Sequence, residues 1–404
     1  MNKLTPKEEL AQKQPIIDRI LSASLDELKD WALETFHSEE NQRRIHNPNQ
    51  KKFIIYIGRT VYAKLLDFTP QEFFTDAEKS FAAQLKEKLF IHHVLEEDTP
   101  FNLNVGVDLG TALEATLFGM DFVIPTTADP TYANGTFLQE LEDYKKLEMP
   151  DFYKSGWMPE AHRLYNELQG LSGGAFDIYF PGWARGPWSM ATILRGFNNI
   201  FEDYIEDPEA LGAFLMFLAD ARIHFENQRC KFLGIEPSDL TRRWTYCSYR
   251  YNYNSDIFED EVDGNLFSAQ MNREIIIPAQ KKLSDYYHGI SYYHSCGSLA
   301  SLYDDIATLN VRKYQHISPA TFPAYEKIDR LLAPEVIAQI SLKPTDVATM
   351  EDPAEIRRML ESKTGHLNGR KAEICADALF EGGWELIEKV MNWRNLFREL
   401  EQTH

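Results

Sequence analysis

Hydrophobic positions divide the chain into two parts with different periodicities. Residues 1–50 are polar and rich in Gln, Glu and Lys, and their apolar residues recur at helical spacing. These apolar residues are Ile16, Ile17, Ile20, Leu21, Leu25 and Leu28. We therefore predict an N-terminal helical extension of one or two helices over residues 1–50. From about residue 50, short β-branched or aromatic runs alternate with amphipathic stretches, which is typical of a parallel sheet with crossover helices.

Eight short runs in the second part are candidate strands. They lie near residues 101–107, 122–126, 176–181, 244–249, 290–294, 313–317, 336–341 and 371–375. Most intervening segments have helical periodicity, and Asp207-Pro208 and Asp352-Pro353 each have the pattern of an N-cap followed by Pro at the first helical position. Eight such units predict an α/β fold of the (β/α)8 TIM-barrel type over residues 51–404, and a doubly wound open sheet is the alternative.

Composition and charge limit the classes of partner. The 404 residues include 42 Lys and Arg against 62 Asp and Glu, which gives a formal net charge of −20 at pH 7. This excess of negative charge repels phosphate backbones and acidic membrane surfaces, so we expect neither nucleic acid nor membrane as a partner. No run approaches the roughly 18 apolar residues that span a bilayer, and the N-terminus lacks the apolar core of a secretory signal. The four cysteines are too few for a disulfide scaffold in so long a chain, which favours a reduced, cytoplasmic setting.

The strongest chemical signal is His294-Ser295-Cys296-Gly297, at the end of the fifth candidate strand. Residues i and i+2 of a strand point to the same face, so His294 and Cys296 can both face a barrel mouth, where imidazole and thiolate suit Zn²⁺. Cys375 lies at the end of the last candidate strand. Because barrel active sites collect side chains from several strand ends, these three residues can converge on one ion with an open fourth position. The alternative is that they are ordinary buried residues of the core.

Other polar and aromatic side chains are expected near the same strand ends. Arg185 lies between Trp183 and Trp188 after the third candidate strand, where it could clamp a substrate carboxylate or form a structural stack on an indole. Tyr249, Tyr251 and Tyr253 alternate along the chain, and they form either one wall of an aromatic pocket or a half-buried strand. His316, at the end of the sixth strand, is either a substrate hydrogen-bond partner or a structural residue. Asp256, Asp260 and Asp263 form either an acidic loop with a role in the site or a solvated turn.

Three sequence blocks are similar to a known family. The run Tyr179-Phe180-Pro181-Gly182-Trp183-Ala184-Arg185-Gly186-Pro187-Trp188 and the motif His294-Ser295-Cys296-Gly297 resemble blocks of the uroporphyrinogen decarboxylase superfamily. The stretch from Asp260 to Pro278 resembles the segment before the H-x-C-G motif in the non-decarboxylase branch, which includes zinc-dependent methyltransferases that act with corrinoid proteins. The resemblance extends over roughly residues 50–390.

This resemblance implies a zinc-dependent methyltransferase that moves a methyl group between a small substrate, such as an ether, thiol, thioether or amine, and a corrinoid protein. It implies His294, Cys296 and Cys375 as zinc ligands, with Glu274 as a competing ligand because some demethylase relatives bind zinc through Glu and His. The D-x-H-x-x-G motif that ligates cobalamin is absent from the sequence, so the corrinoid would come with a partner protein. The expected substrate-binding residues are Trp183, Arg185, Trp188, Tyr249, Tyr251 and His316.

Two other functions stay open at this point. The first is a metal-free decarboxylase of the uroporphyrinogen type. Such decarboxylases have an Arg-rich substrate motif just after the first strand, whereas residues 104–110, at the end of our first candidate strand, contain no Arg, which makes this function less favoured. A non-catalytic barrel that binds a ligand or a corrinoid partner would contain no metal. The sequence leaves open the methyl donor, the direction of transfer and whether the chain forms a homodimer.

Overall fold

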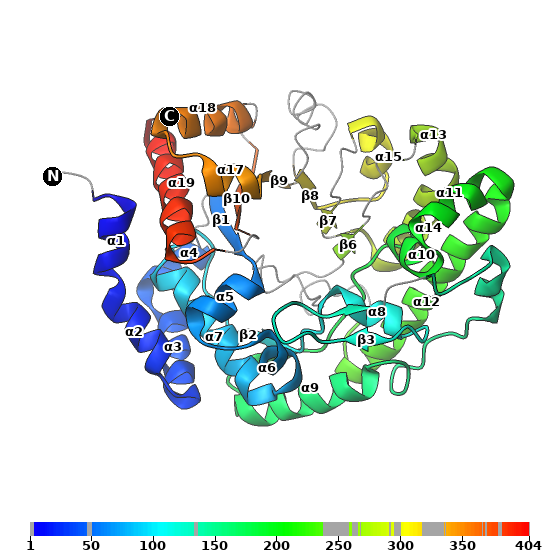
Figure 1. The fold of residues 1–404 in the computed structure, drawn as a ribbon, viewed down its shortest axis with the longest axis horizontal. Coiled ribbons are helices and arrows are strands. Elements are labelled where there is room, and N and C mark those ends of the chain that lie inside the picture. The colour runs from blue at the N-terminus through cyan, green and yellow to red at the C-terminus, as the bar shows by residue number, and fades with distance from the viewer. Residues whose placement is uncertain are drawn as a thin grey trace.

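Parallel strands and covering helices make up most of the fold (Figure 1). The computed structural model describes residues 4–46, 51–132, 136–236, 258–260, 266, 268–290, 292–294, 300–316, 335, 337–365, 367, 370–378 and 382–403. The strands are β1 (Lys51–Ile57), β2 (Asn104–Gly106), β3 (Phe122–Val123), β4 (Thr131–Tyr132), β5 (Asp177–Tyr179), β6 (Phe258–Asp260), β7 (Tyr292–His294), β8 (Lys313–His316), β9 (Ile337–Leu342) and β10 (Ala372–Ala378).

Helices follow or precede almost every strand. Those before β5 are α1 (Pro6–Gln12), α2 (Gln14–Ser22), α3 (Leu25–His37), α4 (Glu39–His46), α5 (Arg59–Leu66), α6 (Pro70–Thr75), α7 (Ala77–His93), α8 (Leu113–Thr116) and α9 (Met158–Ser172). Those after it are α10 (Pro187–Arg195), α11 (Phe197–Glu206), α12 (Pro208–Leu233), α13 (Ala269–Met271), the π-helical turn η4 (Asn272–Ile276), α14 (Ile277–Tyr287), α15 (Tyr303–Ala307), α17 (Pro344–Thr349), α18 (Pro353–Thr364) and α19 (Trp384–Thr403).

All strands of the two main sheets are parallel. One sheet has the order β1-β10-β9-β8-β7-β6, and the second pairs β2 with β5. The free edge of β1 is bonded by side chains: the Phe53 N–H donates to Asp98 Oδ2 at 2.8 Å, and the Ile55 N–H donates to Glu97 Oε2 at 2.7 Å. The described residues therefore form an α/β fold with parallel sheets, and within them the two sheets do not close into a ring.

Most of the predicted strands are confirmed. The runs 101–107, 176–181, 290–294, 313–317, 336–341 and 371–375 contain or overlap β2, β5, β7, β8, β9 and β10, whereas 244–249 lies outside the described residues. The prediction of a sheet strand at 122–126 is wrong, because this segment forms only the short antiparallel pair of β3 with β4. Pro125 lies in the run and has no N–H to donate to a longer ladder. The strands β1 and β6 were not predicted.

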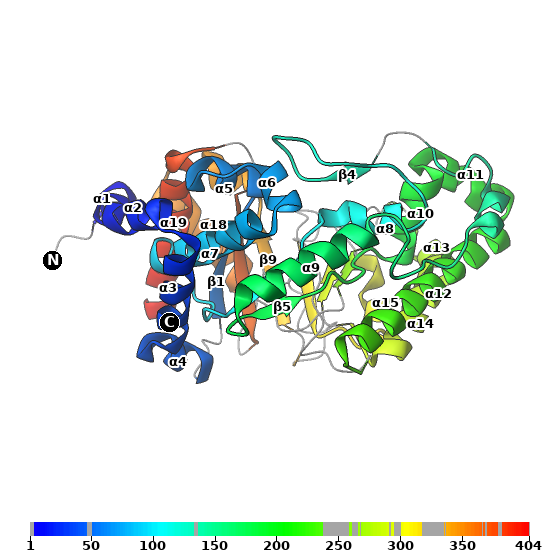
Figure 2. The same cartoon turned by 90° about the horizontal axis from the view of Figure 1, so that it is seen from below.

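The N-terminal extension contains four helices, more than the one or two that we predicted. Capping boxes start two of them, because Thr5 pairs with Glu8 and Ser24 pairs with Glu27. The predicted apolar positions Ile17, Ile20 and Leu28 are buried. Figure 2 places these helices beside α19 at one end of the molecule, so the first and last helices of the described chain cover the same side of the sheet.

Both predicted Asp-Pro helix starts are confirmed. The Ala210 N–H donates to Asp207 Oδ1 at 3.0 Å at the start of α12, and the Ala354 N–H donates to Asp352 Oδ1 at 3.0 Å at the start of α18. Among the helices that the structure describes, we found none with the length and apolar character that a bilayer crossing requires.

Candidate functional site

The large sheet has one apolar and one polar face. Phe53, Ile340 and Ile374 point to the apolar face, where they pack into the core under the helices. On the other face, the parallel register aligns Cys375 of β10 with Ser341 of β9, and it aligns Asp377 with Tyr56 of β1. Because side chains alternate along a strand, Glu373, Cys375 and Asp377 of β10 all face the polar side. The titratable side chains of β10 therefore lie on that face.

A buried ion pair lies at the N-terminal end of the polar face. Lys313 Nζ of β8 lies 2.8 Å and 2.9 Å from the two carboxylate oxygens of Glu373. The Gln339 side-chain amide donates to Glu373 Oε2 at 3.0 Å, and the Tyr292 hydroxyl donates to Gln339 Oε1 at 2.5 Å. Burial lowers the pKa of Lys313 to about 8, against the opposing influence of Glu373. Every member of this network is satisfied, so it forms a structural floor under the site.

Cys375 and Asp377 form a second buried pair on the same face, closer to the strand end. The Cys375 thiol donates to Asp377 Oδ1 at 3.2 Å, and neither residue is more than 4% exposed. Burial raises the pKa of Asp377 to about 7, while hydrogen bonds from Cys375 and Ser341 and the charges of His294 and Lys363 oppose this rise. Burial, together with the Asp377 carboxylate, also raises the pKa of the Cys375 thiol well above its usual value. Sequence reasoning missed Asp377, although its i+2 spacing from Cys375 was a usable signal.

The structure places two of the three expected zinc ligands on the polar face. His294 is the last residue of β7, is half-buried, and is close enough to influence the Asp377 carboxyl. Cys296 lies outside the described residues. In the described part of the chain, no three His, Cys, Asp or Glu side chains are grouped closely enough to hold a metal ion.

The position of Cys375 differs from the prediction. We expected it at the end of the last strand, but β10 continues for three residues beyond it, to Ala378. Continued pairing with β1 explains the longer strand, since Asp377 aligns with Tyr56 and Ala378 aligns with Ile57. At about 3.3 Å per residue, Cys375 lies roughly 10 Å below the end of the strand. Asp377 is therefore the polar-face residue of β10 nearest to that end.

The segment after β5 positions Arg185 from several sides. Trp183 and Trp188 are both buried in the core, and Trp183 Nε1 donates to the Arg185 carbonyl oxygen at 2.9 Å. Arg185 itself is half-buried. Glu114 of α8 is buried, and its Oε1 accepts hydrogen bonds from the N–H groups of Ala184 at 2.7 Å and Arg185 at 3.3 Å. The two buried indoles thus support this segment. Of the three predicted substrate-binding residues Trp183, Arg185 and Trp188, Arg185 has the most accessible side chain.

The other predicted residues lie elsewhere or outside the description. Glu274 of η4 is exposed, accepts a hydrogen bond from Gln270 at 2.9 Å, and lies 3.5 Å from the Tyr204 hydroxyl on α11. His316 ends β8 and Asp260 ends β6, but only their backbones are described. The residues outside the description are Tyr249, Tyr251, Tyr253, Asp256 and Asp263.

An arginine that the sequence analysis overlooked lies directly after β1. We looked for a substrate arginine after the run 101–107, but β1 is the first parallel strand, and Arg59 follows it. The Arg59 guanidinium donates to Asp108 Oδ2 at 2.9 Å, and its central carbon lies 3.4 Å from the centre of the Phe73 ring. Both charged side chains of this pair are at most 1% exposed. Arg59 is therefore held in a buried structural ion pair.

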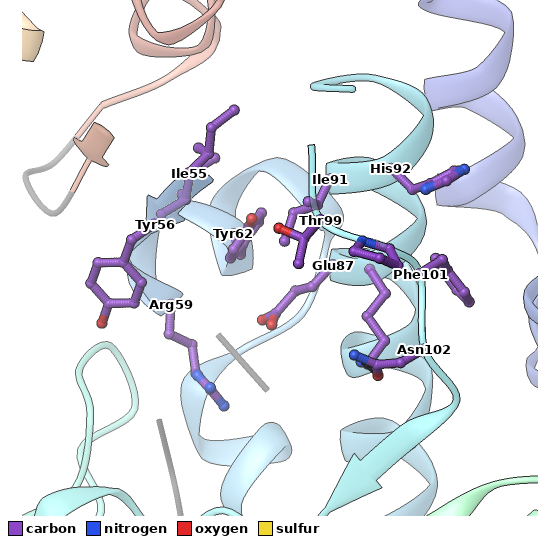
Figure 3. Close-up of a pocket in the computed structure, with 13 residues that line it drawn as sticks. Ile55, Tyr56, Arg59, Tyr62, Glu87, Ile91, His92, Thr99, Phe101 and Asn102 are labelled. Carbon is purple, nitrogen blue, oxygen red and sulfur yellow. Dashed lines mark hydrogen bonds between the residues drawn. The ribbon is translucent and has the colours of Figure 1, made fainter. Parts of the chain in front are cut away.

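A small cavity adjoins this pair (Figure 3). Tyr56, Arg59, Tyr62, Glu87 and His92 contribute to its lining, and its volume is about 30 Å³. That volume accommodates a water molecule or two. Figure 3 shows Arg59 and Glu87 reaching toward the same region from α5 and α7. Such a space is too small for a substrate, so the candidate site is taken as His294, Cys375 and Asp377 on the polar face of the large sheet. Arg185, after β5, is a separate candidate for substrate binding.

Comparisons with known proteins bear on this arrangement. Residues 104–231 match the family model "Uroporphyrinogen decarboxylase (URO-D)". This stretch runs from β2 to α12 and contains Glu114 and Arg185. Among solved structures, a methyltransferase from Methanosarcina mazei is similar, with a TM-score of 0.57 and 13% sequence identity over 88% of this chain and 96% of that chain. No curated protein matches. At this identity the structural likeness concerns the fold.

Proposed function

We propose that this chain is a zinc-dependent methyltransferase with a TIM-barrel architecture, resembling the corrinoid-linked branch of the uroporphyrinogen decarboxylase superfamily. The observation that carries the proposal is the buried Cys375–Asp377 pair on the polar sheet face toward which His294 is also directed. The family match at residues 104–231 and the fold shared with a methyltransferase support it. The eight parallel strands of the two sheets also suit a barrel whose mouth lies at their C-terminal ends.

The donor types on the polar face suit a zinc ion. Imidazole nitrogen and thiolate sulfur are donors that zinc takes, and His294 and Cys375 offer one of each. Because the described residues include no group of three such side chains close enough to hold a metal ion, the proposed site depends on Cys296 as a further ligand. Burial and the Asp377 carboxylate raise the pKa of the Cys375 thiol, and a divalent cation at the sulfur would favour the thiolate. We propose His294, Cys296 and Cys375 as the ligands, with Asp377 beside them. When bound, zinc would act as a Lewis acid on the heteroatom that loses or gains the methyl group.

The side chains of this chain would perform three tasks. Asp377 Oδ1 accepts the hydrogen of the Cys375 thiol, so it is placed to receive that proton when the sulfur becomes a thiolate. The Lys313–Glu373 pair closes the floor of the site and fixes the strands that carry these donors. Arg185, whose backbone N–H is held by Glu114, would bind a carboxylate of the substrate.

Methyl transfer requires the two reacting partners to lie in line. We propose that a separate corrinoid protein docks over the mouth and supplies the second partner, because the sequence has no cobalamin-ligating motif. The alternative of a metal-free decarboxylase draws support from the family match. However, Arg59, the residue at the position where such an enzyme would place a substrate arginine, is already paired with Asp108 and buried.

Methyl transfer to a free corrinoid tests the proposal. The full-length protein, supplied with zinc, would be incubated with cob(I)alamin and a panel of methyl ethers, methyl thioethers and methylamines, and methylcob(III)alamin would be followed by its absorbance. We expect methylation with at least one donor class, and loss of the activity in Cys375→Ser. Folded, zinc-loaded protein that methylates cob(I)alamin from no donor, but releases carbon dioxide from a carboxylated tetrapyrrole, would favour the decarboxylase instead.

A further inference from the structure

Glu114 is a buried acid that the chemistry proposed above does not use. It lies on α8, directly after the β2 segment, and its side chain reaches the segment after β5. There one carboxylate oxygen, Oε1, accepts the N–H of Ala184 at 2.7 Å and the N–H of Arg185 at 3.3 Å. Glu114 is only 2% exposed, and burial raises its pKa against the hydrogen bonds and the Arg185 charge. Burying this carboxyl group is energetically unfavourable, and its hydrogen bonds to two consecutive backbone amides offset that cost.

The same backbone is held from its other side. The carbonyl oxygen of Arg185 accepts hydrogen bonds from Trp183 Nε1 at 2.9 Å and from Arg222 Nη1 at 3.3 Å. Arg222 belongs to α12, is 1% exposed, and its guanidinium lies 5.5 Å from the centre of the Tyr287 ring. Buried side chains from two helices therefore fix both the amide and the carbonyl of Arg185, while its own side chain stays half-buried.

Two carboxylates link successive segments at this end of the strands. Asp108, after β2, binds Arg59 after β1, and Glu114, also after β2, binds the backbone after β5. Asp108 also accepts the Gly110 N–H at 2.8 Å, which shapes the turn leading to α8. The position of Arg185 is therefore defined relative to β1 and β2, and not only by its own strand.

We propose that Glu114 is a positioning residue that holds Arg185 for the carboxylate of a carboxylate-bearing substrate. A guanidinium binds a carboxylate through two parallel N–H···O bonds, and this geometry is lost when the arginine backbone moves. Fixing the amides of Ala184 and Arg185 sets the direction in which the Arg185 side chain leaves the backbone. The inference rests on the proposed function only in taking Arg185 as a substrate-binding residue.

The test compares a charged probe with a neutral one of the same shape. Benzoate and benzamide would be titrated into the full-length protein, with affinities measured by ligand-observed NMR and the fold checked by thermal unfolding. We expect wild-type protein to bind benzoate at least about tenfold more tightly than benzamide, which is the range of one charge-assisted hydrogen bond. In Arg185→Gln this preference should disappear, and in Glu114→Ala it should fall to about twofold or less.

Two further variants separate positioning from general stability. Glu114→Gln keeps an oxygen that can accept both N–H groups, so it should restore most of the preference that Glu114→Ala loses. Asp203→Asn removes another buried carboxylate, which pairs with Arg195 at 2.8 Å, and it should lower thermal stability without changing the preference. Equal preference in wild type and Glu114→Ala, or an unchanged preference in Arg185→Gln, would overturn the proposal.

The outcome is independent of the methyl-transfer assay. Binding of benzoate needs neither zinc nor a corrinoid, so an intact preference in a protein that transfers no methyl group would overturn the proposed reaction alone. A wild-type protein that transfers methyl groups but binds benzoate no better than benzamide would overturn the role of Glu114 and Arg185 alone. If Glu114→Ala does not fold, a preference in Glu114→Gln as weak as that in Arg185→Gln would contradict positioning through the backbone amides.

Discussion

Glu373 and Asp377 lie on the same strand and face the same side, yet their surroundings differ. Glu373 has a full counter-charge, because both of its oxygens lie within 2.9 Å of Lys313 Nζ. Asp377 has a thiol at 3.2 Å and only weaker influence from Lys363 and His294, so burial dominates and raises its pKa to about 7. The first carboxylate is satisfied and structural, whereas the second is suited to chemistry.

Removing the counter-charge of Glu373 should be costly. Lys313→Met leaves a buried carboxylate without its cation, and we expect it to lower the free energy of unfolding by about 3 to 5 kcal/mol in urea denaturation. The matched control is Lys281→Met, which breaks the exposed pair of Lys281 with Asp285 and should cost less than about 1 kcal/mol. A loss in Lys313→Met no larger than in the control would contradict the buried ion pair.

His92 should make the protein sensitive to mild acid. Burial lowers its pKa from 6.5 to about 3, so between these pH values the unfolded chain binds a proton that the folded side chain does not. Stability therefore falls as the pH decreases through this window, by about 2 kcal/mol at pH 5 relative to pH 7.5. His92→Gln should shrink the difference in unfolding free energy between these two pH values by that amount.

The control for this experiment is His37→Gln, at the exposed C-terminal end of α3. Because this side chain is exposed, we expect the substitution to change the free energy of unfolding by less than about 0.5 kcal/mol. A difference that is the same in wild type and His92→Gln would show that the buried ring is not the source of the acid sensitivity.

At the scale of elements, α12 depends on a cap that the sequence already indicated. Asp207 Oδ1 accepts the Ala210 N–H at 3.0 Å, and Pro208 occupies the first turn. Asp207→Ala should destabilise the protein by about 1 kcal/mol, while Asp207→Asn should retain most of the stability, because Asn caps as well as Asp. Thermal unfolding of both variants checks this. Equal losses of stability in the two variants would show that the cap hydrogen bond of Asp207 does not stabilise α12.

The strands and caps could be predicted because their signals are local. β7 and β9 contain short apolar or aromatic runs, and their pairing partners did not have to be known. β1 was missed although its run Phe53-Ile54-Ile55-Tyr56-Ile57 is a local strand signal, because our list of candidate strands began only at residue 101. The end of β10 was misplaced for a different reason, since Asp377 and Ala378 are held by their partners in β1.

The candidate site was predictable only where strand alternation governs it. His294 and Cys375 followed from strand position, but the depth of Cys375 depends on the strand's true end. Glu114 could not be ranked from sequence, because its importance comes from burial and from contacts with a segment far along the chain. Asp377 had a usable local signal in its i+2 spacing from Cys375, but only its burial distinguishes it from other strand carboxylates. The sequence does not distinguish a tryptophan that lines a pocket from one in the core. The structure buries Trp183 and Trp188, which places both in the core.

At the scale of the whole molecule, the two ends of the chain stabilise each other. The Arg394 side chain of α19 is 1% exposed and forms an ion pair with Glu9 of α1. Its Nη1 also donates a hydrogen bond to the Leu95 carbonyl oxygen. Asn395 donates to Glu9 Oε2 at 2.9 Å as well. The N-terminal helices are therefore joined to the last helix by a buried polar contact in addition to apolar packing.

Glu9→Ala should loosen this junction. The Arg394 guanidinium would stay buried without its carboxylate, and we expect a loss of about 2 to 3 kcal/mol in the free energy of unfolding. Glu34→Ala, on the exposed side of α3, is the matched control and should change stability by less than about 0.5 kcal/mol. A Glu9→Ala variant as stable as the control would contradict the proposed link between the two ends.

Zinc content tests the central proposal most directly. Plasma mass spectrometry would be applied to tag-free wild type and to Cys296→Ser, Cys375→Ser and Cys230→Ser, the last of which changes a buried cysteine on α12. We predict near-stoichiometric zinc in wild type and Cys230→Ser, and its loss in the other two variants. Folded wild-type protein without zinc after purification and after zinc supplementation, or zinc retained equally in all four proteins, would contradict the proposed site.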